Sequence, residues 1–266
     1  MRAPSRFHLS VERELQAIPR KPSKWDLEFL QSYMRTELKM LGLSLPVQRA
    51  LYQRGYDELR ELSYEKRAPY WLAVWNRSRV HAALSQVLFF FEDWAQARKK
   101  MKKRGEIEFV YDPLWPYLVA MVDRVENWAH SDGLSSLLSA ALEERQRERL
   151  PLLKKWNRDV KRPWYRRQSI VSLHYYSRSR QKPLASKVTL PMVQALLKDE
   201  HFYVQRGVGW TLRECYNVDP AATTTFVRKH VTNLSAIAFS AATEKMPAAL
   251  KSELKTKRKH HRNVSK

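Results

Sequence analysis

Cysteine, glycine and long apolar runs are all scarce in this sequence. Cys215 is the only cysteine among the 266 residues, which excludes a disulfide within the chain and a metal site built from several thiolates. No apolar segment approaches the roughly 20 residues that a helix needs to span a bilayer. The basic N-terminus also lacks the apolar core of a signal peptide. We therefore expect a cytoplasmic protein without a metal site.

Strands are poorly supported as well, because β-branched alternation is rare and the chain has only six glycines. The dominant residues, Leu, Ala, Arg, Lys, Glu and Gln, favour helices. The spacing of apolar residues predicts helices with short links at 26–41, 46–57, 64–76, 78–103, 114–125, 128–142, 146–159, 164–178, 189–198, 202–216, 219–230 and 234–246. Helix pairs at intervals of roughly 35–45 residues are typical of HEAT-like repeats. We predict an all-α solenoid, a superhelical stack of antiparallel helix pairs with a concave face, with a compact irregular bundle as the alternative.

The charge balance is strongly positive, since 49 Lys and Arg against 27 Asp and Glu give 49 − 27 = +22. Such an excess concerns partners and solubility rather than fold, and nucleic acid is the polyanion whose binding depends most on Lys and Arg. A basic run spans residues 98–104, and a second one ends the chain. Each run either adds non-specific attraction to phosphates or is simply a solvated face or a disordered tail.

Composition divides the chain into three parts. Residues 1–24 are polar with prolines at positions 4, 19 and 22, so we expect a poorly ordered arm with at most one short helix. Residues 25–247 carry the helical pattern and form the main domain. Residues 248–266 form a basic tail, which we expect to be disordered or to contact DNA.

The segment 201–217, HFYVQRGVGWTLRECYN, has two faces when it is drawn as a helix. One narrow arc is apolar and is formed by Val204, Val208, Leu212 and Cys215. The roughly opposite arc combines aromatic and basic side chains and is formed by Tyr203, Arg206, Trp210 and Arg213. Gly207 and Gly209 each cost roughly 1 kcal/mol against alanine in a helix, so something must approach them closely. That something is either DNA or a neighbouring helix.

Two further segments place chemistry-bearing residues in helical register. Trp128 and Asp132 are four residues apart and share a helix face. A carboxylate beside an indole is unusual in a basic protein, although a surface or capping aspartate would explain it equally well. Arg167 precedes the apolar residues of the segment 163–176, where an arginine can also simply point to solvent.

Taken together, these segments resemble the DNA alkylation repair family of HEAT-like, AlkD-like alkylpurine DNA glycosylases over about residues 25–247. The motifs that carry the resemblance are Tyr33-Met34, Leu41-Gly42-Leu43, Pro46 with Arg49, Trp128 with Asp132, Trp164 to Arg167, Phe202 to Arg206, Gly209-Trp210, Leu212 to Glu214, Asp219-Pro220, Leu234-Ser235 and Lys245. Each motif is weak alone, whereas their order and spacing are specific. Asn127 departs from the pattern, because many members have a second aromatic residue there.

The resemblance implies an enzyme that releases positively charged alkylated purines from duplex DNA without flipping the base. It implies that Asp132, Trp128 and Trp210 are catalytic, that Arg167 contacts the DNA backbone, and that Tyr33 faces the DNA. Together with the aromatic and basic arc, the predicted DNA contacts are Arg167, Tyr33, Arg206, Arg213 and Tyr203. We expect no cofactor, a monomer, and a place in the bacterial cytoplasm or nucleoid. The alternatives are a non-catalytic HEAT-like protein that binds damaged or branched DNA, and a helical scaffold for an acidic protein.

Overall fold

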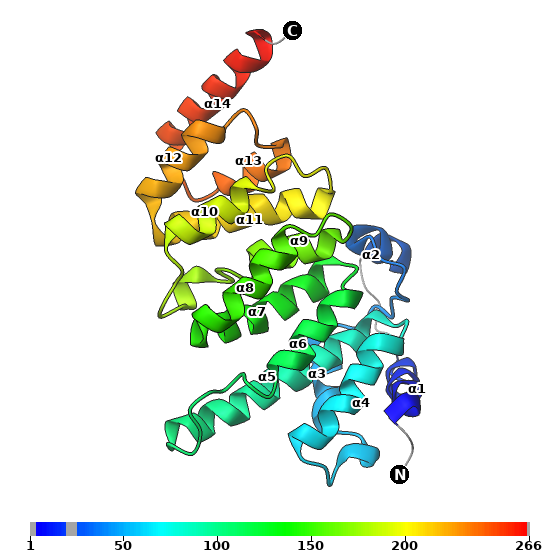
Figure 1. Ribbon diagram of the computed structural model, residues 1–266. Coiled ribbons are helices and arrows are strands. Elements are labelled where there is room, and N and C mark those ends of the chain that lie inside the picture. The colour runs from blue at the N-terminus through cyan, green and yellow to red at the C-terminus, as the bar shows by residue number, and fades with distance from the viewer. Residues whose placement is uncertain (1–3, 20–25, 265–266) are drawn as a thin grey trace. The chain divides into compact units, whose positions relative to one another are not determined.

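The computed structural model describes residues 4–19 and 26–264, and within these ranges the regular secondary structure is helical (Figure 1). An isolated β-bridge between Lys39 and Val80 is added to the helices. The chain divides into two compact units, Met1–Leu137 and Leu138–Lys266, so the boundary falls inside helix α7, Trp128–Glu144. The predicted all-α class is confirmed, whereas the boundary predicted between residues 24 and 25 lies outside the described residues.

The first unit is built around aromatic side chains. Its helices before α7 are α1 (Pro4–Gln16), α2 (Leu27–Met34), α3 (Leu45–Arg54), η1 (Asp57–Leu59), α4 (Tyr64–Arg77), α5 (His81–Lys103), α6 (Trp115–Met121) and η2 (Val122–Arg124). Trp71 of α4 stacks on Phe90 of α5 at a centroid distance of 5.8 Å, and Phe90 in turn contacts Trp94. These side chains and Trp75 of α4 are each at most 2% exposed. Burying such rings supplies a large part of the hydrophobic stabilisation of a unit of this size.

The predicted N-terminal arm contains one helix, α1, as the sequence allowed, but this helix is packed rather than poorly ordered. Phe7, Val11 and Leu15 follow one another at helical spacing and are at most 2% exposed. The ring of Phe7 packs edge-on against Trp71 at a centroid distance of 5.3 Å, and Glu12 accepts a hydrogen bond of 2.6 Å from the hydroxyl of Ser78. The packing of this helix was missed because only three of its residues form the apolar stripe, and the residues on which the stripe packs are distant in the sequence.

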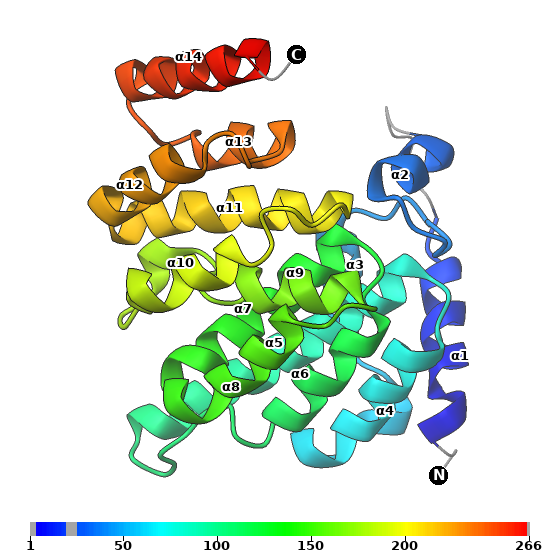
Figure 2. The same cartoon turned by 45° about the horizontal axis from the view of Figure 1, so that its top comes forward.

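The second unit continues with helix pairs. After the last turns of α7 come α8 (Gln146–Asn157), α9 (Pro163–Val171), η3 (Ser177–Ser179), α10 (Ser186–Gln194), α11 (Phe202–Val218), α12 (Pro220–His230), α13 (Ala236–Ala242) and α14 (Ala248–Val264). Helix α11 contacts α9, α10, α12 and α13 and is the central element of this unit. Figure 2 shows α11, α13 and α14 in successive layers. Asp219 caps α12, since its Oδ1 accepts from the N–H of Ala222 at 3.0 Å.

The segment predicted to be a disordered or DNA-contacting tail forms helix α14 over Ala248–Val264, and its contact with DNA stays a prediction. Leu254 is fully buried, and two cations near it donate hydrogen bonds to backbone carbonyls of the same unit. Lys257 donates to the carbonyl of Arg228 at 3.0 Å and Arg258 to that of Val231 at 3.0 Å, where α12 ends. Carbonyls at a helix C-terminus lack partners within the helix, so these two cations complete them. The basic composition therefore ties the last helix to the unit.

Some helix ends differ from the spacing-based prediction. Helix α2 ends at Met34 because Arg35 adopts a left-handed conformation at φ 48°. After it, Lys39 forms the β-bridge with Val80. In this bridge the N–H of Lys39 donates to the carbonyl of Arg79 at 2.7 Å, and the N–H of His81 donates to the carbonyl of Lys39 at 3.1 Å. Among the described residues, none of the helices combines the length and apolar character that crossing a bilayer requires.

Candidate functional site

Trp128 and Asp132 lie on the first two turns of α7, in the first unit. Asn127 caps this helix, because its Oδ1 accepts from the N–H of His130 at 3.0 Å and its carbonyl accepts from the N–H of Ser131 at 3.1 Å. A capped first turn fixes the directions of both side chains, which are one turn apart and half-buried. The predicted sharing of one helix face is confirmed, and Asn127, a departure from the family pattern, acts as a cap.

Two aromatic rings from α2 continue the surface of Trp128. The ring of Tyr33 meets the indole at a centroid distance of 5.7 Å and an angle of 87°. Phe29 stacks on Tyr33 at 6.1 Å and 7°, and these two side chains are 43% and 57% exposed, respectively. Thr36 donates a hydrogen bond to Glu126, which ties the segment after α2 to the start of α7. We call Phe29, Tyr33, Trp128 and Asp132 the Trp128 cluster.

Behind this cluster, α7 packs against α5 through two buried histidines. The rings of His81 and His130 stack at a centroid distance of 4.2 Å. The Nδ2 group of Asn127 faces Nδ1 of His130 at 2.9 Å, so this ring nitrogen accepts and the imidazole is neutral. Burial lowers the pKa of His130 well below its usual value and lowers the pKa of His81 to about 4. The support of α7 is thus polar but uncharged at neutral pH.

Trp210 is half-buried on α11, in the second unit, and lies among aromatic rings and one cation. Tyr175 stacks on its indole at 5.2 Å and 29°, and Tyr176 meets it edge-on at 6.4 Å. The guanidinium carbon of Arg213 is 5.3 Å from the indole centroid, and its nitrogens pair with Glu214 at 3.2 Å and Glu244 at 3.0 Å. We call Tyr175, Tyr176, Trp210 and Arg213 the Trp210 cluster.

The apolar arc of α11 is confirmed, and the role of its glycines is now decided. Each side chain of the predicted stripe is at most 1% exposed: Val204, Val208, Leu212 and Cys215. A Cβ on Gly209 would lie 2.5 Å from the carbonyl oxygen of Ala238 on α13, and one on Gly207 would lie 3.3 Å from Arg167 and Val171 on α9. Neighbouring helices approach both glycines.

The opposite arc is smaller than the sequence predicts. Tyr203 of the aromatic and basic arc is only 6% exposed and stacks on Trp164 at 5.1 Å, so its side chain is buried and its contact with DNA stays a prediction. Because several helices surround α11, its buried face is wider than one stripe. Arg167 is 5% exposed and donates to the carbonyl of Tyr203 at 2.9 Å. Its implied contact with DNA stays a prediction, whereas Arg206 is exposed as expected.

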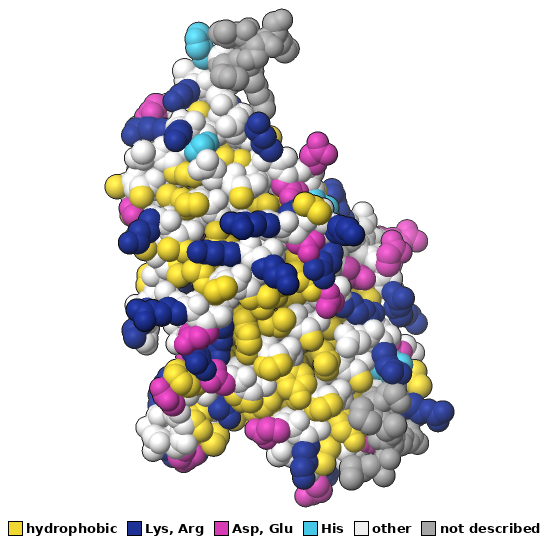
Figure 3. All heavy atoms as spheres, in the orientation of Figure 1, with side chains coloured by type: hydrophobic (Ala, Val, Ile, Leu, Met, Phe, Trp, Pro, Cys, Tyr) yellow, Lys and Arg dark blue, Asp and Glu magenta, His cyan; other side chains and the backbone are white. Residues whose placement is uncertain are grey.

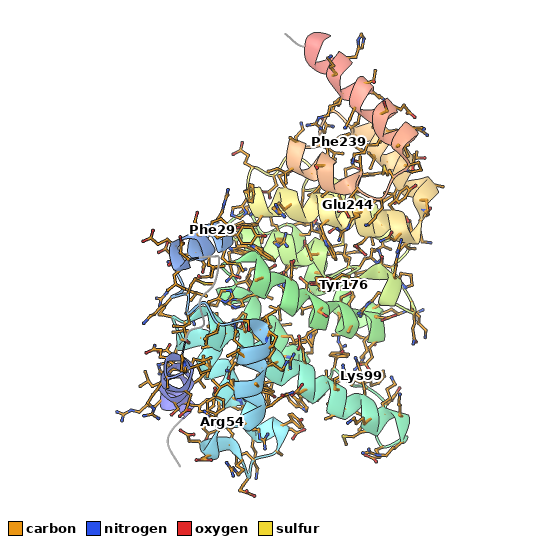
Figure 4. The ribbon with its side chains drawn as sticks, turned by 180° about the vertical axis from the view of Figure 1, so that it is seen from behind. Phe29, Arg54, Lys99, Tyr176, Phe239 and Glu244 are labelled. Atoms are coloured by element: carbon orange, nitrogen blue, oxygen red, sulfur yellow. The ribbon has the colours of Figure 1, made fainter. Side chains whose placement is uncertain are left out.

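Sequence reasoning missed three aromatic members of the two clusters. Phe29 is four residues before Tyr33, the spacing at which helical side chains meet, so its pairing was available from the sequence. Tyr175 and Tyr176 were placed inside a helix predicted to run to residue 178. In the structure α9 ends at Val171, and the two tyrosines lie in the turn that follows it (Figure 4).

A basic hollow of about 640 Å³ lies at the turn between α8 and α9. Its lining residues are Pro151, Lys154, Lys155, Arg158, Asp159, Val160 and Lys161. The carboxylate of Asp159 is engaged by Arg162 at 2.6 Å, which lowers the pKa of that carboxyl. Val160 is 87% exposed at the tip of the turn. Figure 3 shows further Lys and Arg side chains over the elements α9 to α12.

The basic run at residues 98–104 ends α5 and is used in two ways. Arg98 donates to the carbonyls of Val110 and Phe109 at 2.6 and 2.8 Å, and Arg104 pairs with Glu106. The lysines at positions 99, 100, 102 and 103 are exposed on the last turns of the helix (Lys99 in Figure 4). The arginines therefore hold the following loop, and the lysines face solvent.

Comparison with known proteins agrees with the helical architecture. The sequence model of the family described as DNA alkylation repair enzyme matches residues 13–246. The chain belongs to this family. A solved structure titled as a predicted DNA alkylation repair enzyme from Enterococcus faecalis superposes with a TM-score of 0.66 at 13% identity, covering 87% of this chain and 100% of that one. AlkD2 from Streptococcus mutans gives a TM-score of 0.46 at 14% identity, covering 92% of this chain and 100% of that one. A search of curated proteins finds no match.

Proposed function

We propose that this protein is a monofunctional DNA glycosylase, which hydrolyses the N-glycosidic bond of positively charged N3- or N7-alkylated purines in duplex DNA. Its substrates would include 3-methyladenine and 7-methylguanine. The observation that carries the proposal is the pairing of Trp128 and Asp132 on one capped face of α7, in a chain of the DNA alkylation repair family. Membership of the family supports a role in DNA repair, and the side chains suggest the reaction.

The chemistry of the lesion explains why a single carboxylate can suffice. Alkylation at N3 or N7 makes the purine a cation, so it is already a good leaving group and needs no general acid. Positive charge develops on the deoxyribose as the bond stretches. A carboxylate fixed where charge develops stabilises the transition state more than the ground state. Asp132 takes this part and also positions the attacking water.

The indoles supply a second, smaller contribution. An aromatic face attracts a cation by up to about 2 kcal/mol when the pair is desolvated. Trp128 lies one turn from Asp132 and is packed edge-on by Tyr33, so its ring is held in place. Trp128 packs on the sugar of the lesion, and Trp210 is the second indole that the family resemblance assigns to catalysis. Neither they nor Asp132 offers an amine for a Schiff base, so strand cleavage does not accompany base release.

Binding of DNA relies on arginines near the two clusters, which contact the phosphates of the DNA backbone. Arg206 is exposed and Arg213 flanks Trp210, so both are candidates for backbone phosphates. Arg167 remains a candidate through the family resemblance, although its guanidinium is buried. The lesion is read from the backbone side, without flipping of the base.

Release of bases from defined duplexes tests the proposal. The wild-type protein should release 7-methylguanine and 3-methyladenine but leave uracil, which is neutral and would need a protonation step to depart easily. Release of uracil at a comparable rate would contradict the reliance on a cationic leaving group. Tight binding of the alkylated duplex without release would favour the alternative, a non-catalytic protein that binds damaged DNA.

A further inference from the structure

Tyr176 has a backbone conformation that its residue type adopts rarely. Its φ of 49° and ψ of 66° lie in the left-handed region, which is unfavourable for any residue with a Cβ and is more accessible to Asn or Gly. Its side chain is nevertheless 60% exposed. The strain therefore does not serve to bury the ring. Strained residues of this kind concentrate at functional sites, where the surroundings hold them in place.

The surroundings of Tyr176 hold it from both sides. The carboxylate of Glu214 accepts from the N–H of Ser177 at 2.9 Å and from its hydroxyl at 2.7 Å. Glu214 is only 4% exposed, so these charge-assisted bonds form in a nearly dry environment. On the other side, the N–H of Tyr175 donates to the hydroxyl of Ser139 at 3.2 Å. The turn is thus pinned on α11 and α7 within the second unit.

The pinned ring extends the surface of Trp210. Tyr176 meets Tyr175 edge-on at 4.7 Å and Trp210 edge-on at 6.4 Å, while Tyr175 stacks on the indole. Glu214 also pairs with Arg213, whose guanidinium lies near the same indole. The buried carboxylate of Glu214 therefore holds both the turn of Tyr176 and the guanidinium of Arg213 near Trp210.

We propose that Tyr176 is a DNA-contacting residue, whose exposed ring packs on the deoxyribose of a nucleotide at the lesion, beside Trp210. Aromatic rings bind such surfaces well because each base and each sugar offers an apolar face, and Arg213 supplies a charge for the adjoining phosphate. The assignment rests on the DNA substrate of the proposed function, but not on base release. The proposed contact lies next to Trp210 and depends on the turn that Glu214 holds at Ser177.

Two substitutions separate the ring from the fold. Tyr176→Asn removes the ring but suits the left-handed backbone, so its melting temperature should equal or exceed that of the wild type. Tyr176→Phe keeps the ring and serves as the matched control. The probe is a duplex with a tetrahydrofuran abasic analogue, which holds an unstacked site and cannot undergo base release.

Fluorescence anisotropy with this duplex and with an undamaged one should distinguish the outcomes. We expect Tyr176→Asn to bind the abasic-analogue duplex at least about 5-fold more weakly than the wild type. It should bind the undamaged duplex within about 2-fold, and Tyr176→Phe should match the wild type on both. Unchanged affinity of Tyr176→Asn for the analogue, or an equal loss in Tyr176→Phe, would overturn the contact. Absence of base release by the wild type would contradict the proposed glycosylase activity. The binding result would still test the contact of Tyr176 with DNA, because the abasic-analogue duplex undergoes no base release.

Discussion

The two aromatic clusters are built alike around a half-buried tryptophan, but they differ in charge. The Trp128 cluster presents a carboxylate, Asp132, one helical turn from its indole. The Trp210 cluster presents a guanidinium, that of Arg213, 5.3 Å from its indole. A carboxylate suits a sugar that becomes positive, and a guanidinium suits a phosphate. The two indoles therefore lie in surroundings of opposite charge, a carboxylate near Trp128 and a guanidinium near Trp210.

The supports of the clusters differ as well. The Trp128 cluster lies on a capped helix that is backed by the neutral histidines His81 and His130. The Trp210 cluster depends on a turn pinned by the buried carboxylate Glu214 and on close packing at Gly209. Perturbing each support separately should therefore separate the two clusters.

The largest expected effect concerns the buried histidines. Burial lowers the pKa of His81 in the first unit and of His174 in the second from 6.5 to about 4. Between these pH values the unfolded chain binds a proton and the folded chain does not, so stability falls as pH drops from 6.5 towards 4. The loss is roughly 3 kcal/mol for each of these groups.

Urea unfolding of the wild type, His81→Gln and His174→Gln at pH 7 and pH 4.5 measures these contributions. Each variant should lose less stability on acidification than the wild type. If both variants kept the full pH dependence of the wild type, the buried histidines would not be its source.

The next largest effect concerns stability and the two glycines Gly209 and Gly133, which lie on the helices that carry the two clusters. A Cβ on Gly209 would lie 2.5 Å from the backbone oxygen of Ala238, whereas a Cβ on Gly133 would lie 2.6 Å from the tip of the Leu88 side chain. A backbone moves less easily than a leucine. Gly209→Ala should therefore lower the free energy of unfolding by about 1–3 kcal/mol. Gly133→Ala should stay within about 1 kcal/mol of the wild type, since the gain in helix propensity offsets the clash.

Chemical unfolding of both variants under one condition tests this contrast. Equal losses in the two variants, or a larger loss in Gly133→Ala, would show that the close approach of α13 to α11 is not what requires the glycine.

The smallest expected effect concerns the basic hollow of the second unit. The variant Lys154→Gln/Lys155→Gln/Lys161→Gln should weaken binding to undamaged duplex DNA. It should also reduce the slope of log K against log salt by up to about 3, since each contacted phosphate contributes about 0.9. The matched control is Lys182→Gln/Lys187→Gln/Lys198→Gln, three exposed lysines of the same unit outside the lining of that hollow.

Anisotropy titrations at several salt concentrations compare the two triple variants. A slope that falls equally in both would mean that only net charge matters, and the hollow would have no special part.

Sequence periodicity recovered the features that depend on local spacing. Each predicted helix has a counterpart in the structure, and the shared face of Trp128 and Asp132 and the buried stripe of α11 were both correct. These features follow from the 3.6-residue period alone. The ends of the chain were misjudged because their partners are distant. Phe7 needs Trp71, and Arg258 needs the carbonyls at the end of α12.

The missed parts of the candidate site have the same origin. The burial of Tyr203 on the aromatic and basic arc was missed because one helix drawn alone does not reveal how many neighbours surround it. The turn that presents Tyr176 depends on Glu214, whose contact with Ser177 spans 37 residues. The proposal that Trp128, Asp132 and Trp210 take part in catalysis comes from the family resemblance and not from periodicity, and it stays a prediction.

Single-turnover release of 7-methylguanine by the wild type and by Asp132→Asn, with the protein saturating the duplex, tests the central claim most directly. The substitution preserves shape and removes the charge. The account predicts that both proteins bind the duplex within a few-fold of each other, while the variant releases the base at least about 100-fold more slowly. Release by Asp132→Asn at the wild-type rate would contradict the part given to this carboxylate.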